Sequence, residues 1–130
     1  MAATRKIIIV VEDEPDTAEM FAEMVRLSGY EVRKAAGSSA AIYMIAQEQP
    51  DAVVLDWMLP DVSGLEVLRY IRREPTMAHI PVIIVSAKGS PSDIKKGLDA
   101  GASAYLTKPV TMEEFLTAIE QATSGDQARE

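Results

Sequence analysis

The chain has 130 residues, which suits one domain with a substantial core, because domains of roughly 100 to 150 residues are the commonest. A hydrophobic content of 48% beside 25% charged residues predicts an ordered globular protein and excludes a disordered chain. The net charge of -7 argues against direct nucleic-acid binding, which needs a basic surface. With no cysteine, disulfides, thiolate zinc sites and thiol nucleophiles are excluded, and the cytoplasm is the expected location.

Five short apolar or β-branched runs alternate with helical patterns along the chain, which indicates repeated βα units. Three of these runs are apolar at every position, as expected for central strands of a parallel sheet that is covered on both faces. The first run is also too short for a signal peptide core or a membrane span, so no membrane association is expected. The runs are Lys6–Val11, Glu31–Ala35, Ala52–Leu55, Val82–Val85 and Ala104–Leu106.

Helix boundaries are readable between these strands. The first helix is predicted from about Pro15 to Ser28, with Gly29 placed to end it. Val110 and Phe115 have the spacing of a hydrophobic staple at the start of the last helix. Three further start signals are Ser63 with Glu66, Ser90 with Pro91, and Thr111 with Glu114, the first and last being capping boxes.

A fivefold βα alternation with right-handed crossovers predicts a doubly wound α/β fold. At this size we expect a five-stranded parallel sheet of the flavodoxin-like order 2-1-3-4-5. Residues 1–123 are predicted to form this domain, and residues 124–130 a polar, frayed tail or the stub of a linker to a further domain.

Polar side chains follow four of the five strands at the carboxyl edge of the predicted sheet, where ligands bind in open α/β folds. Taken singly, each of them would be an ordinary helix cap or solvated charge. Their common position predicts a site. They are Glu12 and Asp13 after the first strand, Asp56 after the third, Ser86 after the fourth and Lys108 after the fifth.

The three carboxylates of this set crowd one edge of the sheet, so a cation is expected to offset their charge. Magnesium suits Asp13 and Asp56 together with a backbone carbonyl, because it prefers oxygen ligands. A carboxylate beside such an ion can act as a nucleophile toward phosphorus. Lys108 and Ser86 would then bind two oxygens of the phosphoryl group.

The chain resembles the receiver domain of bacterial two-component response regulators over about Lys6 to Ala122. The acidic pair, the acceptor segment, the switch pair and the lysine–proline element of that family all have counterparts here. They are Glu12-Asp13, Asp56-Trp57-Met58-Leu59-Pro60, Ser86-Ala87 and Tyr105-Leu106-Thr107-Lys108-Pro109.

The resemblance implies a role for each of these positions. Asp56 is the expected phosphoacceptor, with Lys108 and Ser86 binding the phosphoryl group and Tyr105 turning inward as a switch. The Lys108–Pro109 bond is expected to be cis. The implied ion is Mg²⁺ or Mn²⁺, and its implied ligands are Asp13, Asp56, Glu12 through a water, and the backbone carbonyl of Met58.

The same resemblance implies a phosphorylation switch rather than a turnover enzyme. A histidine kinase, a phosphotransfer protein or a small acyl phosphate would donate, and an output domain or target protein would respond through the fourth helix, fifth strand and fifth helix. Homodimerisation on phosphorylation is also implied by the resemblance. However, Ser103, Ala104 and Ala118 replace charged residues of the dimer face found in the winged-helix subgroup.

Two other functions fit the predicted fold. A metal-dependent phosphohydrolase with an aspartyl intermediate needs an acid/base carboxylate two residues beyond its nucleophile, where this chain has Met58. A flavin-binding electron carrier needs a hydroxyl-rich phosphate loop after the first strand, where this chain has Glu12-Asp13-Glu14. Asp61 is interpreted as an ordinary helix cap or solvated loop charge, His79 as an exposed loop residue, and Trp57 as packing or partner surface beside the acceptor.

Overall fold

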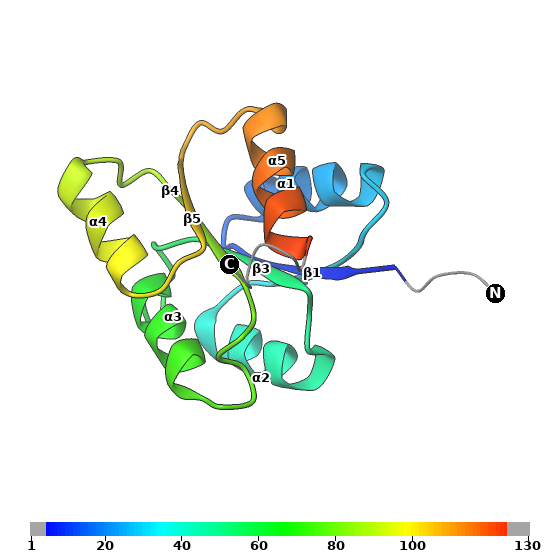
Figure 1. Cartoon of the computed structure of the whole chain (residues 1–130). Helices are drawn as coiled ribbons and strands as arrows, with labels where there is room; N and C mark the ends of the chain where they lie inside the picture. Colours follow the sequence, from blue (N-terminus) through cyan, green and yellow to red (C-terminus); the bar gives the residue numbers. More distant parts are fainter. Residues whose placement is uncertain (1–4, 125–130) are drawn as a thin grey trace.

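The computed structural model describes residues 5–124 as one parallel sheet with helices on both faces (Figure 1). The strands lie in the order β2-β1-β3-β4-β5, which confirms the predicted doubly wound arrangement. The strands are β1 (Ile7–Val11), β2 (Glu31–Ala35), β3 (Ala52–Leu55), β4 (Val82–Ser86) and β5 (Ala104–Thr107). The helices are α1 (Pro15–Leu27), α2 (Ser38–Glu48), α3 (Gly64–Arg73), α4 (Pro91–Asp99) and α5 (Met112–Thr123).

Alternate residues of the central strands supply two cores, one on each face of the sheet. Ile8 of β1 packs with α1 and α5, where the Phe21 and Phe115 rings stack at a centroid distance of 4.8 Å. The next residue, Ile9, belongs to the core under α2 and α3. Because β1, β3 and β4 are covered on both sides, their continuously apolar sequences are explained.

The predicted strands agree with the observed ones to within one residue at each end. β1 begins at Ile7 instead of Lys6, whose ammonium donates to the Thr123 carbonyl at 2.6 Å. β4 and β5 each continue one residue beyond the predicted end, because Ser86 pairs with Thr107 in the parallel ladder.

The predicted start and end residues of the helices agree with the structure, apart from a shift of one residue at the end of α1 and an incomplete capping box in α3. α1 ends at Leu27 rather than Ser28, and Gly29 follows it with a φ of 95°. α5 has the predicted capping box, with bonds between Thr111 and Glu114 in both directions. For α3, the Ser63 side chain caps the Glu66 amide as predicted, but the Glu66 carboxylate pairs with Arg69.

α2 is capped from a distant part of the chain. Its N-cap residue is Gly37, which has no side chain to offer. The carboxylate of Asp61, in the loop between β3 and α3, accepts from the Ser38 amide at 3.1 Å and from the Ser38 hydroxyl at 3.0 Å. These bonds from Ser38 hold the pKa of Asp61 down to about 2. Asp61 is thus a helix cap, one of the two ordinary roles expected for it, and it caps α2 from a distant loop.

α4 is weakly anchored compared with the other helices, since Gly97 is its one buried residue. The turn after α4 is nevertheless braced from α3. The Arg72 guanidinium donates to the carbonyl of Gly101 at 3.0 Å, and to those of Ala78 and Ile80 at 3.1 and 2.7 Å. Burial lowers the pKa of this guanidinium. Arg72 therefore holds the start of β5 in place while α4 itself has few contacts.

Within residues 5–124, no helix is both long and apolar enough to cross a bilayer. The last helix ends at Thr123, the predicted end of the domain. Of the predicted tail, residues 125–130 lie outside the described part of the chain.

Gly64→Ala should destabilise the protein by roughly 1–3 kcal/mol or more, because an added methyl group would lie 2.1 Å from the Asp56 carbonyl oxygen. Denaturant unfolding monitored by circular dichroism measures the effect. Gly37→Asn is the control, because a Cβ there meets only the Asp61 carboxylate, at 3.4 Å, and asparagine is a good N-cap residue. Equal stability of Gly64→Ala and wild type would contradict the tight packing of Gly64.

Asp61 should make the stability of the protein sensitive to acid. Because folding lowers its pKa from 3.8 to about 2, its contribution is complete above pH 3.8 and is lost as the pH falls toward 2. Asp61→Asn should therefore be less stable at neutral pH and lose less stability between pH 4 and 2. Denaturant midpoints across this range test the slope. Asp99→Asn, on exposed α4, should keep the wild-type profile.

Candidate functional site

The register of the sheet brings the predicted site residues to one edge. Val11 of β1 pairs with Leu55 of β3, so the residues that follow them, Glu12 and Asp56, emerge side by side. The Asp56 amide donates to the Val11 carbonyl at 3.1 Å, which continues the pairing to the acceptor position. On the other side of β3, the Lys108 amide donates to the Ser86 carbonyl at 2.9 Å. Parallel pairing alone therefore gathers side chains from four strand ends.

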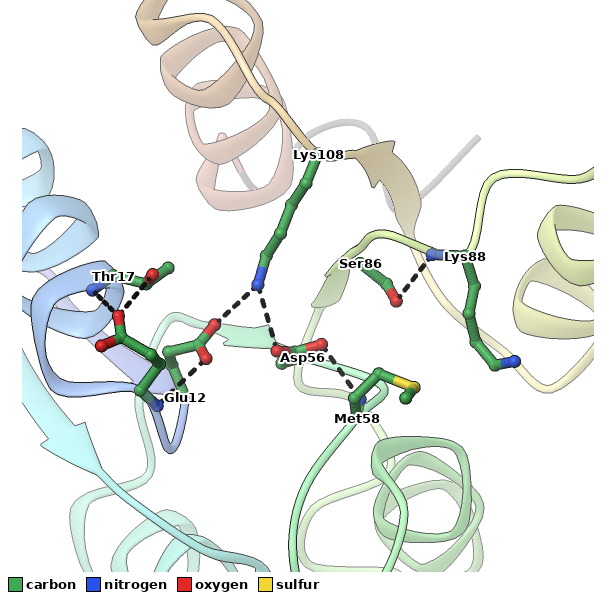
Figure 2. A network of polar contacts seen from close by, with 8 residues as sticks. Glu12, Thr17, Asp56, Met58, Ser86, Lys88 and Lys108 are labelled. Atoms are coloured by element: carbon green, nitrogen blue, oxygen red, sulfur yellow. Dashed lines mark hydrogen bonds and ion pairs between the residues drawn. The ribbon is translucent and has the colours of Figure 1, made fainter.

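Lys108 lies between two carboxylates (Figure 2). Its ammonium is 3.0 Å from Glu12 Oε1 and 3.1 Å from Asp56 Oδ2. Both acidic residues are buried, with exposed fractions of 5% and 6%, and they would repel each other without this cation. A buried carboxylate pair with one shared lysine is the central interaction of the site.

The protonation equilibria follow from this arrangement. Burial raises the pKa of Glu12, and the neighbouring Asp56 charge raises it further, against the bond from Lys108. Burial works to lower the pKa of Lys108, but the bonds to Glu12 and the charge of Asp56 outweigh it and raise the pKa. The ammonium form of Lys108 is therefore stabilised by its two acidic partners.

Asp13 completes a group of oxygen donors. One carboxylate oxygen from each of Glu12, Asp13 and Asp56 lies within 4.8 Å of the others, and Asp13 is the exposed member. A single lysine leaves this cluster with excess negative charge. An arrangement of carboxylate oxygens with one open side suits a hard divalent cation such as Mg²⁺ or Mn²⁺.

The loop after β3 keeps Met58 next to the acceptor. The Met58 amide donates to Asp56 Oδ1 at 3.0 Å, while its side chain is 57% exposed. The Gly64 amide closes the loop by donating to the Trp57 carbonyl at 2.8 Å. The Met58 backbone thus contacts the acceptor through its amide, and the predicted ligand role of its carbonyl stays a prediction.

Ser86 lies on the other side of Asp56 from Glu12 (Figure 2). It is fully buried, and its hydroxyl oxygen accepts from the Lys88 amide at 3.2 Å. That bond leaves the hydroxyl hydrogen free to be donated. Ser86 therefore links the site to the first residues of the loop between β4 and α4.

An aromatic pair backs the same loop. The Tyr105 hydroxyl donates to the Lys88 carbonyl, and the Tyr105 ring meets Trp57 edge-on at a centroid distance of 6.2 Å. The Lys88 ammonium lies 5.5 Å from the Trp57 ring centroid, in cation–π range. Trp57 is only 8% exposed, so it packs beside the acceptor rather than forming partner surface. Burial raises the pKa of Tyr105.

The structure brings together Glu12, Asp13, Asp56 and Lys108, and it has Ser86 and Tyr105 around the loop after β4. The Lys108–Pro109 bond is cis, as the resemblance implies. The Tyr105 hydroxyl donates to the Lys88 carbonyl in this structure. The inward turn of Tyr105 on phosphorylation stays a prediction. His79 is an exposed loop residue, as interpreted.

Two features were missed from the sequence. The Lys108 ammonium pairs with Glu12 as well as with Asp56. The sequence position of a long, flexible side chain does not reveal which carboxylates it contacts. Asp61 joins the loop after β3 to the start of α2. The one available signal was Gly37, a helix-start position without a capping side chain.

Comparisons with family models, curated proteins and solved structures all point to the same family. The response regulator receiver domain model matches residues 8–120. Among solved structures, a response regulator from Chloroflexus aurantiacus has a TM-score of 0.89 and 30% identity, covering 93% of this chain and 99% of that one. A CheY-like receiver domain protein from Methanospirillum hungatei has a TM-score of 0.88 and 26% identity, covering 98% and 100%.

Curated relatives are longer. The phosphate regulon regulatory protein PhoB of Pseudomonas aeruginosa is 36% identical over 115 residues, which cover 88% of this chain and 50% of PhoB. The regulatory protein TcrX of Mycobacterium tuberculosis is 43% identical over 109 residues, covering 84% of this chain and 46% of TcrX. The chain thus spans about half the length of such relatives. It belongs to the response regulator receiver domain family.

Proposed function

We propose that Asp56 accepts a phosphoryl group from a histidine kinase or a phosphotransfer protein in a reaction that depends on Mg²⁺ or Mn²⁺. The observation that supports this most directly is the Lys108 ammonium, 3.1 Å from Asp56 Oδ2, beside a three-carboxylate cluster. Asp13, Asp56, Glu12 and the Met58 carbonyl would hold the ion. We further propose that the reaction takes place in the cytoplasm.

The two oxygens of Asp56 have different partners, and this supports different roles for them. Oδ1 accepts from the Met58 amide and Oδ2 from Lys108. One carboxylate oxygen forms a bond to phosphorus as the bond between phosphorus and the donor's imidazole nitrogen breaks, and that nitrogen keeps the electron pair. The bound divalent ion would offset charge on the phosphoryl oxygens. Lys108 and the Ser86 hydroxyl would each bind one of those oxygens.

The chemistry of the site favours a switch over the two alternatives. A phosphohydrolase would need an acid/base carboxylate where Met58 stands, and the Met58 side chain is exposed. A flavin phosphate would meet the acidic groups of Glu12 and Asp13. A long-lived aspartyl phosphate, reset by slow hydrolysis, fits these residues better.

Ser86 would transmit the effect of phosphorylation to the loop before α4. When its hydroxyl turns to a phosphoryl oxygen, the bond from the Lys88 amide is lost, and the loop before α4 is free to rearrange. Tyr105 holds the same loop, and α4 is anchored by one buried residue, Gly97. The surface formed by α4, β5 and α5 would change, and an output domain, a target protein or a second phosphorylated copy would read it.

Wild type should bind beryllium fluoride, a phosphoryl mimic, in the presence of Mg²⁺, and should form a covalent adduct with acetyl phosphate. Asp56→Ala should do neither, because the oxygen that attacks phosphorus is gone. Fluorescence of Trp57 measures the first and intact-protein mass spectrometry the second. Asp99→Ala, which removes an exposed acidic residue of α4 outside the carboxylate cluster, should still form the adduct. Equal adducts from wild type and Asp56→Ala would refute the acceptor assignment.

Lys108→Met should separate ion binding from phosphoryl binding. Removing the ammonium leaves Glu12 and Asp56 without their shared cation, so Mg²⁺ should bind as tightly as in wild type or more tightly. Beryllium fluoride should bind at least about tenfold more weakly, since one charge-assisted bond of roughly 1.5–3 kcal/mol is lost. Lys95→Met, on exposed α4, should change neither titration. Weaker Mg²⁺ binding in Lys108→Met would argue against this division.

A further inference from the structure

The loop that carries the acceptor's neighbours is held at both ends. We call residues 57–63 the acceptor loop. Its start is fixed by the Met58 amide on Asp56 Oδ1, and its closure by the Gly64 amide on the Trp57 carbonyl. Gly64 leaves no space for a side chain there, with the Asp56 carbonyl oxygen 2.1 Å from a built Cβ. The ends of the loop are therefore rigid.

The middle of the acceptor loop has few buried contacts of its own and is held mainly by polar bonds from another segment. Pro60, Asp61 and Val62 are exposed, and Leu59 is half-buried against the core under α2 and α3. Little buried apolar surface fixes this stretch, and such segments open easily unless polar bonds hold them.

Those bonds come from the start of α2. Asp61 accepts from the amide and hydroxyl of Ser38 and, at 3.4 Å, from the amide of Ser39. The Ser38 side chain is buried, with 1% exposed, and its hydroxyl oxygen accepts from the Val62 amide at 3.3 Å. Its single hydrogen is shared between Asp61 Oδ1 and the Val62 carbonyl. Two consecutive loop residues are thus tied to a helix more than 20 residues earlier in the sequence.

Capping α2 does not require this long connection. Gly37 has an extended φ of -156°, and an added Cβ there would meet nothing closer than the Asp61 carboxylate, at 3.4 Å. An asparagine or serine at residue 37 could cap the helix locally. The distant carboxylate does something that a local cap cannot do: it fixes the acceptor loop.

We propose that Asp61 and Ser38 form an anchor that positions the acceptor loop, so that the Met58 carbonyl is held ready for a divalent cation. Asp61 is a positioning residue in this view, because it lies outside the carboxylate cluster and acts through the loop. The inference rests on the proposed cation site. Outer partners of metal ligands commonly account for a tenfold or larger part of metal affinity.

Four variants separate the anchor from the cap. Asp61→Ala removes the cap and the carboxylate part of the anchor and leaves the bonds between Ser38 and Val62. Asp61→Ala with Gly37→Asn restores the cap of α2 but not the anchor. Asp61→Asn removes the charge and keeps one oxygen acceptor. Ser63→Ala is the matched control, since it removes the α3 cap at the end of the same loop, where Ser63 Oγ accepts from the Glu66 amide at 3.3 Å.

Mg²⁺ is titrated against each variant at about 0.1 M salt, where charges more than about 10 Å apart are largely screened. The emission of Trp57, the only tryptophan, reports binding. Denaturant unfolding gives stability, and amide hydrogen exchange at Val62 reports the loop without metal. The double variant should regain stability yet bind Mg²⁺ about tenfold more weakly than wild type and exchange faster at Val62. Ser63→Ala should lose stability and keep wild-type Mg²⁺ affinity. Asp61→Asn should keep Mg²⁺ affinity and Val62 exchange close to wild type, although it is less stable at neutral pH.

Wild-type Mg²⁺ affinity in the double variant would overturn the anchor and leave Asp61 as a helix cap alone. Equal losses in Asp61→Asn and Asp61→Ala, with unchanged exchange at Val62, would assign the effect to charge and also overturn it. A wild type that does not respond to Mg²⁺ would instead refute the proposed cation site, and the anchor's purpose with it. The three failures are therefore distinguishable.

Discussion

The site depends on electrostatic balance among Glu12, Asp56 and Lys108. Two buried carboxylates next to each other are costly, and a single ammonium 3.0 and 3.1 Å away offsets that cost only in part. The exposed Asp13 adds a third negative group at the open side of the cluster. Lys108 therefore offsets part of the carboxylate repulsion in the folded protein, and the remaining negative charge still attracts a cation. Lys108 is already in contact with the residue that we propose is modified, so no long movement is needed to bind a new charge there.

Most of the fold and the main site could be predicted because they follow from local patterns. Continuously apolar runs such as Val82–Val85 identify buried parallel strands, and the first polar residue after such a run must lie at the sheet's carboxyl edge. Glu12, Asp56 and Ser86 are found by that rule, and Lys108 lies one residue beyond Thr107, the first polar residue after the fifth run. Boundaries moved by one residue, as where the pairing of Ser86 with Thr107 extends β4 and β5 beyond their apolar runs.

What the sequence did not reveal are contacts whose partners are far apart and chemically ordinary. Asp61 is one exposed acid among many, and its bond to Ser38 becomes visible only when the loop after β3 lies beside the start of α2. The same is true of the predicted capping box of α3, where Glu66 could turn to Ser63 or to Arg69 and the two choices look alike in sequence. Side-chain competition of this kind is decided by geometry, not by spacing.

The distribution of burial suggests where the structure would respond to a change of charge at Asp56. β1, β3 and β4 are packed on both faces and have little freedom to move, whereas α4 has one buried residue and the loop before it is held by Ser86 and Tyr105 through Lys88. We therefore expect a charge added at Asp56 to displace the loop before α4 more readily than the central strands. Arg72 fixes the turn after α4, so rearrangement would concentrate at the N-terminal end of that helix, the end nearest to Ser86 in the chain.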